Sequence, residues 1–275
     1  MHFSATLFTS VALLASTVTC LPNSIHSLNS TSSAAFTSAA TASSTATSSP
    51  AASTSSPGTT TNSAATTALF QKLVLAPSSV ERFNLLTDAD LLFNFNDSSA
   101  HPAGSPGVAT GLGGQLVRAD QATFPALYMQ GGSMALGFLG PCGFNTPHVH
   151  PRANELFLVI EGRLNASTML ENGGRKIHNL VNKLQMTIFP QGSVHTQFNP
   201  DCTPATFVAS FTGSDPGVAQ IAQEFLGFSE EEVNAAVGGP VIVGGMDVDA
   251  FRSRIPDNVV LGVEGCLKKC GIEKR

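Results

Sequence analysis

Two histidines and a glutamate lie within eight residues of one another in the segment 145–155, NTPHVHPRANE. Side chains alternate between faces along a β-strand, so His148 and His150 point to the same side. Pro151 lacks the N–H that a sheet ladder needs, so the strand can end there and a new strand can bring Glu155 back toward both histidines. Neutral imidazoles and a carboxylate are ligands for divalent metals, and His195, in the segment 190–195 (PQGSVH), is a fourth candidate.

A His-x-His pair alone has an ordinary alternative explanation, in which the two rings simply occupy positions in a β-rich protein. The combined pattern argues against that alternative, because Glu155 is followed by Gly162, and PQGSVH is followed by Asn199. We therefore predict a metal site formed by His148, His150, Glu155 and His195. Three further histidines lack ligand spacing and are interpreted as surface or loop residues; they are His26, His101 and His178.

These two segments resemble the two sequence motifs of the cupin superfamily, and their surroundings resemble germins and germin-like proteins of the secreted, fungal, spherulin-like type. The first motif reads Gly-x5-His-x-His-x3,4-Glu-x6-Gly, and in this chain Cys142 replaces the leading glycine. The second motif reads Gly-x5-Pro-x-Gly-x2-His-x3-Asn, and Leu184 stands at its leading glycine. The resemblance covers about the last three-quarters of the chain.

The resemblance implies a mainly β fold, a single cupin jelly-roll β-barrel with C-terminal α-helices that help to form homo-oligomers. It also implies manganese at the four predicted ligands, and oxalate oxidation or superoxide dismutation as the reaction. Two asparagines would hold oxalate in such a site. Asn145 matches one of them, whereas Ala135 stands where the second is expected.

Short apolar runs separated by turn signals independently predict a β-sandwich or barrel. After residue 214 the pattern becomes helical. A helix is predicted over 215–227, a second begins at a Ser229–Glu232 capping box, and a third covers 259–270. The expected strands are a pair within 123–139, then 155–160, 163–170, 184–189, 195–198 and 205–211, with an entry strand after a turn in 80–95 and a loop over 104–114.

The chain divides into three predicted regions. Residues 1–20 resemble a secretory signal peptide, since an apolar run ends in small residues near Cys20. Residues 21–67 are rich in Ser, Thr and Ala and predict a disordered, O-glycosylated stalk, although an unmodified linker is an alternative. Residues 68–275 form the predicted cupin domain. The predicted location is extracellular or in a cell wall.

Four cysteines remain after the predicted signal peptide, namely Cys142, Cys202, Cys266 and Cys270. Two disulfides are expected in a secreted chain. If the motif strands face each other in a barrel, Cys142–Cys202 is the favoured pairing, with buried thiols as the alternative. Sequons at Asn96 and Asn165 predict N-glycosylation.

Composition narrows the range of functions. The net charge of −5 and the absence of a basic patch argue against nucleic-acid binding. No further stretch is long and apolar enough to predict a transmembrane helix. No Ser/His/Asp spacing and no phosphate-binding loop is found. The germin resemblance implies a small anionic substrate or superoxide as the partner.

Three functions remain open from the sequence. The first is a redox enzyme of superoxide dismutase type with weak or no oxalate oxidase activity. The second is a non-catalytic, metal-stabilised cell-wall or spore-coat protein. The third, less favoured, is another cupin reaction such as that of a dioxygenase.

Overall fold

The computed structural model describes residues 64–96, 101, 103, 105–242, 245–252, 255 and 258–273. The predicted signal peptide and residues 21–63 lie outside the described residues. The described chain begins with α1 (Ala64–Leu75), which starts inside the stretch assigned to the stalk.

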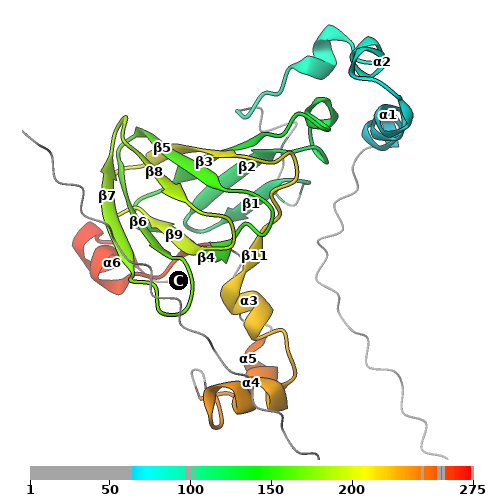
Figure 1. Cartoon of the computed structure of the whole chain (residues 1–275). Helices are drawn as coiled ribbons and strands as arrows, with labels where there is room; N and C mark the ends of the chain where they lie inside the picture. The colour runs from blue at the N-terminus through cyan, green and yellow to red at the C-terminus, as the bar shows by residue number, and fades with distance from the viewer. Residues whose placement is uncertain are drawn as a thin grey trace, which may run out of the picture. The chain divides into compact units, whose positions relative to one another are not determined.

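Two antiparallel sheets form the β-barrel (Figure 1). The first has the strand order β1-β2-β3-β10-β5-β8, and the second has the order β11-β4-β9-β6-β7, with β12 also paired to β4. This arrangement confirms the predicted jelly-roll fold. The strands are β1 (Val108–Gly111), β2 (Gly114–Ala119), β3 (Ser133–Leu139), β4 (Gly143–Val149), β5 (Glu155–Glu161), β6 (Arg163–Met169), β7 (Ile177–Asn182), β8 (Met186–Phe189), β9 (Val194–Phe198), β10 (Ala205–Phe211), β11 (Ala219–Gln220) and β12 (Val259–Leu261).

Strict alternation of inward and outward side chains creates the barrel core. In β5, Phe157 and Val159 are buried on the same face as Glu155, and the intervening residues are more exposed. In β10, Phe207 and Phe211 are buried in the same way. Because a one-residue slip would turn these side chains outward, burial of one face fixes the register of each strand.

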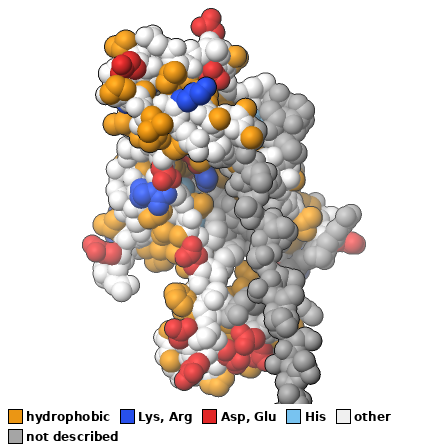
Figure 2. Space-filling view, turned by 90° about the vertical axis from the view of Figure 1, so that its right-hand side faces the viewer, with side chains coloured by type: hydrophobic (Ala, Val, Ile, Leu, Met, Phe, Trp, Pro, Cys, Tyr) orange, Lys and Arg blue, Asp and Glu red, His pale blue; other side chains and the backbone are white. Residues whose placement is uncertain are grey.

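The helices are short and lie before and after the main strands. They are α2 (Ser79–Asn84), η1 (Asp88–Leu91), η2 (Pro125–Leu127), α3 (Ile221–Phe225), α4 (Glu230–Val237), α5 (Val248–Arg252) and α6 (Glu264–Cys270). The Ser229–Glu232 capping box that begins α4 is confirmed. Figure 2 shows acidic side chains gathered over this helix, whose first turn carries three glutamates.

Several local predictions are wrong. Residues 80–95 form α2 and η1 instead of an entry strand, and Pro125 starts η2 where the first strand of a pair was expected. The predicted loop over 104–114 contains β1, which pairs with β2. Residues 219–220 and 259–261 pair with β4, so the helices predicted over 215–227 and 259–270 begin later, at Ile221 and Glu264.

The favoured disulfide pairing is also wrong. Cys142 is bonded to Cys266, and Cys202 is bonded to Cys270. Both bonds attach α6 to the barrel, because β12 returns the C-terminal segment to the edge of β4 beside Cys142. Pairing Cys142 with Cys202 would have left this helix unattached.

None of the described helices is long and apolar enough to cross a membrane.

Candidate metal centre

Three strands bring the four predicted ligands together. His148 lies on β4 and is the cross-strand partner of His195 on β9. His150 directly follows the last residue of β4, and Glu155 is the first residue of β5. As predicted, the chain breaks at Pro151 and restarts, which turns Glu155 toward the histidines.

The donor atoms of these four residues all lie within 4.8 Å of one another. The Glu155 Oε2 atom is 3.0 Å from His150 Nε2 and 3.0 Å from His195 Nε2. The rings of His148 and His195 have centroids 4.2 Å apart. The four side chains therefore converge on a single point.

Each imidazole is held at its other nitrogen by a backbone carbonyl. The Nδ1 atom of His148 lies 2.7 Å from Thr146 O, that of His150 lies 2.5 Å from Gly217 O, and that of His195 lies 2.9 Å from Ser193 O. A carbonyl only accepts hydrogen bonds, so each Nδ1 donates, and in a neutral ring it is then Nε2 that carries the lone pair for a metal. The backbone thus fixes the tautomer that metal binding requires.

Burial governs the protonation of the site. All four side chains are buried, and burial lowers the pKa of His148 to about 3, so its ring is neutral at ordinary pH. Burial alone would raise the pKa of the Glu155 carboxyl, but hydrogen bonds from His150 and His195 outweigh it and hold the pKa well below its ordinary value. The site therefore presents the neutral ring of His148 beside the anionic carboxylate of Glu155.

This donor set fits a divalent metal ion. Ligand atoms about 2.1 Å from a shared ion lie at most about 4.2 Å from each other. The observed spread of up to 4.8 Å is slightly wider, so the four side chains would move slightly inward around an ion. The buried Glu155 carboxylate also has no cationic Lys or Arg partner among the described residues, and a bound cation would compensate its charge.

Two buried amide side chains, those of Gln197 and Asn145, form a hydrogen-bonded chain that ends at Glu155. Gln197 is fully buried, and its Nε2 lies 3.5 Å from Glu155 Oε1 while its Oε1 accepts a 2.7 Å hydrogen bond from Asn145 Nδ2. A residue that replaces the asparagine missing at position 135 would have to line the cavity, and two glutamines, Gln197 and Gln185, are candidates for that role. Neither lines the cavity; Gln185 instead accepts a hydrogen bond from the backbone of Asn182.

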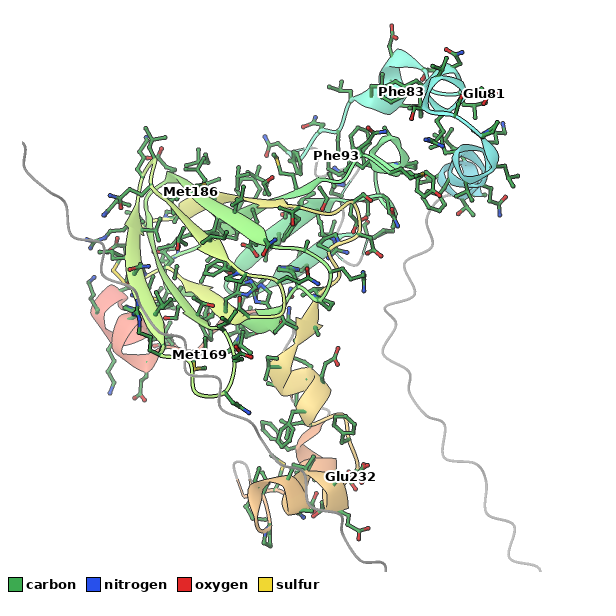
Figure 3. All side chains as sticks on the ribbon, viewed as in Figure 1. Glu81, Phe83, Phe93, Met169, Met186 and Glu232 are labelled. Carbon is green, nitrogen blue, oxygen red and sulfur yellow. A yellow bond between two sulfur atoms is a disulfide. The ribbon has the colours of Figure 1, made fainter. Side chains whose placement is uncertain are left out.

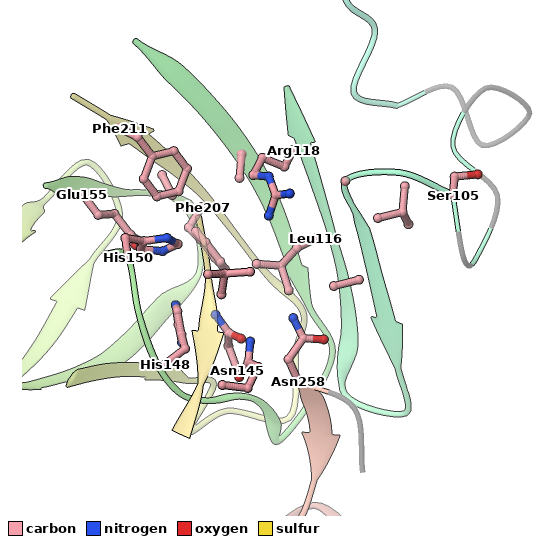
Figure 4. Close-up of a pocket in the computed structure, with 17 residues that line it drawn as sticks. Ser105, Leu116, Arg118, Asn145, His148, His150, Glu155, Phe207, Phe211 and Asn258 are labelled. Carbon is pink, nitrogen blue, oxygen red and sulfur yellow. The ribbon is translucent and has the colours of Figure 1, made fainter. Parts of the chain in front are cut away.

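A cavity of about 240 Å³ opens onto the candidate ligands His148, His150 and Glu155 (Figure 4). Asn145 and Ala135 both line it, in agreement with the positions expected from the germin resemblance. Sequence reasoning missed Arg118, which also lines this cavity. The available signal was the alternation in 114–119, GQLVRA, which places Arg118 on the same face as Leu116 and opposite the buried Val117 and Ala119.

The two non-glycine residues at the motif glycine positions keep a glycine-like backbone. Cys142 has φ 59° and Leu184 has φ 62°, in the left-handed region. Residues other than glycine are sterically strained in this region, because they carry a Cβ atom. Both positions therefore have the backbone conformation that favours glycine, which is the residue expected there from the motifs.

The other predicted site residues lie apart from the metal ligands. His178 is exposed on β7, with its Nδ1 2.7 Å from Ser167 Oγ, and His101 stacks on Phe93. Asn165 lies on the partly exposed face of β6. Asn96 is exposed, but the next two residues of its sequon lie outside the described residues.

Comparison with known proteins agrees with the fold and the site. The cupin family model matches residues 103–237. The chain is 34% identical to spherulin-1A of Physarum polycephalum, over 74% of this chain and 79% of the relative. It is 31% identical to germin-like protein 3-6 of Oryza sativa subsp. japonica, over 60% of this chain and 77% of the relative.

A solved structure of recombinant oxalate oxidase in complex with glycolate superimposes with a TM-score of 0.52 at 25% identity, covering 62% of this chain and 84% of that one. The two paired motifs, the jelly-roll topology and the converging His₃Glu group occur together in a chain that matches these relatives over most of their length. This chain therefore belongs to the cupin family, among its spherulin-like and germin-like members.

Proposed function

We propose that this protein is a secreted germin-like cupin that binds manganese through His148, His150, Glu155 and His195. The observation that supports the proposal best is the tethering of all three Nδ1 atoms by backbone carbonyls. Three nitrogens and one oxygen form a donor set of intermediate hardness, which suits manganese and also iron, nickel, copper or zinc. The germin resemblance favours manganese, and elemental analysis of purified protein identifies the ion.

The proposed activity is redox chemistry of superoxide dismutase type. A redox-active divalent ion in this site would supply one-electron chemistry toward small oxygen species. The protein's own residues orient the ligands and limit water. Phe189 stacks on His195 with ring centroids 4.3 Å apart, and Phe211 lies 4.5 Å from His150. Superoxide is small enough to need no further binding groups in the cavity.

Oxalate oxidation is proposed to be weak or absent. Oxalate is a dianion, and its outer oxygens need hydrogen-bond donors once they leave water. Ala135 offers no donor where the resemblance places an asparagine, and Asn145 already gives a hydrogen bond to Gln197. The site therefore provides poor compensation for the desolvation of oxalate.

A non-catalytic, metal-stabilised cell-wall or spore-coat protein is the second candidate. The Ser/Thr/Ala-rich composition of residues 21–67 and the similarity to two spherulins support it. In this case the metal would contribute only to stability, since an ion that binds only the folded state favours folding.

Two assays on the same metal-loaded preparation separate the candidates. A nitroblue tetrazolium assay measures superoxide dismutation, and a xylenol-orange assay measures peroxide released from oxalate. Dismutation that disappears in a metal-free sample would support the enzyme. Full metal content without either activity would support the structural role.

Secretion and glycosylation form part of the same proposal. We expect secreted material to begin near Leu21 and to carry O-linked glycans on residues 21–67 and N-linked glycans at Asn96 and Asn165. N-terminal sequencing and intact mass test this. An intact Met1, or a mass equal to the bare polypeptide, would contradict it.

A homo-oligomer is also proposed, with a second copy covering the outer face of the first sheet. Leu136, Val208, Leu158 and Met186 are consecutive cross-strand partners on this face, and Met186 points away from the barrel (Figure 3). Met186 and Ile188 of β8 are 62% and 51% exposed. Light scattering after size exclusion gives the mass, and a monomer at micromolar concentration would contradict the proposal.

A further inference from the structure

Arg118 is a charged residue on the inner side of the barrel. It lies on β2 and shares the cavity with the metal ligands, and its side chain is only 28% exposed. Among the described residues that line this cavity, it is the single lysine or arginine (Figure 4). Arginine is rarely placed inward unless it is paired or has a ligand to bind.

Asp120 fixes the Arg118 side chain but uses only one of its donors. The Asp120 carboxylate accepts a 2.6 Å hydrogen bond from Arg118 Nε, and its other oxygen accepts from the backbone N–H groups of Ala122 and Thr123. No described residue forms a hydrogen bond with either Nη atom of Arg118. The two Nη atoms at the planar end of the Arg118 guanidinium, called the fork below, can bind a carboxylate with two hydrogen bonds. This fork therefore remains available.

Small side chains leave room between Arg118 and the metal ligands. Arg118 pairs across the sheet with Ala135, which pairs with Ala209, which in turn pairs with Phe157 on the strand of Glu155. Both alanines line the cavity. Three strand spacings, about 14 Å in total, separate the backbone of Arg118 from that of Phe157, and Glu155 lies two residues from Phe157 along β5. A longer diacid spans more of this distance than a two-carbon acid does.

We propose that Arg118 recognises a carboxylate, and that the cavity takes an organic acid longer than oxalate. One end of the acid binds at the His₃Glu centre, the other accepts hydrogen bonds from the Arg118 fork, and an apolar body lies between them. The sides of the cavity suit such a body, since Leu116, Phe207 and Phe211 line it. This inference rests on the proposed metal site and names the ligand class for it.

Calorimetric titration with glutarate and with oxalate tests the proposal. Glutarate carries two carboxylates on a three-methylene chain, and oxalate has no methylene. The proteins are the metal-loaded wild type, Arg118→Gln, and Arg163→Gln as a matched control. Arg163 also pairs with an aspartate, Asp201, but it lies on β6 and does not line the cavity. Metal content is measured for every sample.

We expect wild type and Arg163→Gln to bind glutarate equally, and Arg118→Gln to bind it roughly ten- to a hundredfold more weakly. Oxalate affinity should not change in Arg118→Gln. No glutarate binding by wild type, or equal affinity in wild type and Arg118→Gln, would overturn the inference. Should Arg118→Gln fail to fold, Arg118→Lys decides the question. The lysine variant keeps the positive charge but lacks the two Nη atoms. Unreduced affinity for glutarate in this variant would overturn the proposal that Arg118 recognises a carboxylate.

If the proposed metal site is wrong, the experiment gives a result that differs from failure of the Arg118 proposal. The wild type would then hold no metal after loading, which contradicts the proposed function. Glutarate is then titrated into the metal-free proteins, and equal affinities in wild type and Arg118→Gln would overturn the role of Arg118 separately.

Discussion

His148 and His195 face each other as cross-strand partners on β4 and β9, with ring centroids 4.2 Å apart. They belong to different sequence motifs, so the register of two strands brings the motifs together. A bulge between Asn145 and His148 adjusts that register. The geometry of the site therefore depends on sheet pairing and not on local sequence alone.

The candidate ligands within one motif were predictable because their spacing reflects local strand geometry. Alternation along β4 places His148, and Pro151 marks the break before Glu155. The pairing of Val259–Leu261 with β4 was not predictable in this way, since its partner lies far away in sequence. The same segment carries a helical pattern, and tertiary pairing overrides it. The Cys142–Cys266 bond was missed for the same reason.

Replacing Leu184 with glycine should stabilise the protein by about 1 kcal/mol, because its backbone has φ 62° and its side chain is 73% exposed. Urea denaturation of the variant measures the change. Leu180→Gly is the control, since Leu180 lies in extended β7 and the substitution should destabilise. A loss of stability in Leu184→Gly would contradict the strain argument.

The metal-free protein should lose stability in acid. The pKa of His148 falls from 6.5 to about 3 on folding, so between these values the unfolded chain binds more protons. The free energy of unfolding should therefore decline as pH falls from 6.5 toward 3. Glu155, whose pKa is also lowered, adds a further loss below its ordinary value of 4.5. Urea denaturation across this range tests the prediction, and unchanged stability between about pH 7 and pH 5 would contradict it.

Removing either disulfide should destabilise the protein by roughly 4–5 kcal/mol in the chain-entropy model, because each bond closes a long loop. The bonds join residues separated by 124 and 68 positions. The double variants Cys142→Ser/Cys266→Ser and Cys202→Ser/Cys270→Ser, compared by denaturant unfolding, test this. Non-reducing peptide mapping checks the connectivity, and a Cys142–Cys202 peptide would show that the pairing is different.

Restoring an amide at position 135 should raise oxalate oxidation. A hydrogen bond to a charged ligand contributes about 1.5–3 kcal/mol, or roughly one to two decades in rate or affinity. Peroxide release from oxalate is measured for wild type and Ala135→Asn at equal metal content. Robust turnover by the wild type would refute the argument, and a gain confined to the variant would support it.

Metal content is the most direct test of the account. Inductively coupled plasma mass spectrometry of wild type, His150→Ala and His178→Ala compares a predicted ligand with an exposed histidine on β7. The account predicts stoichiometric metal in wild type and in His178→Ala, and little in His150→Ala. Full metal content in His150→Ala, or none in the wild type after loading, would contradict it.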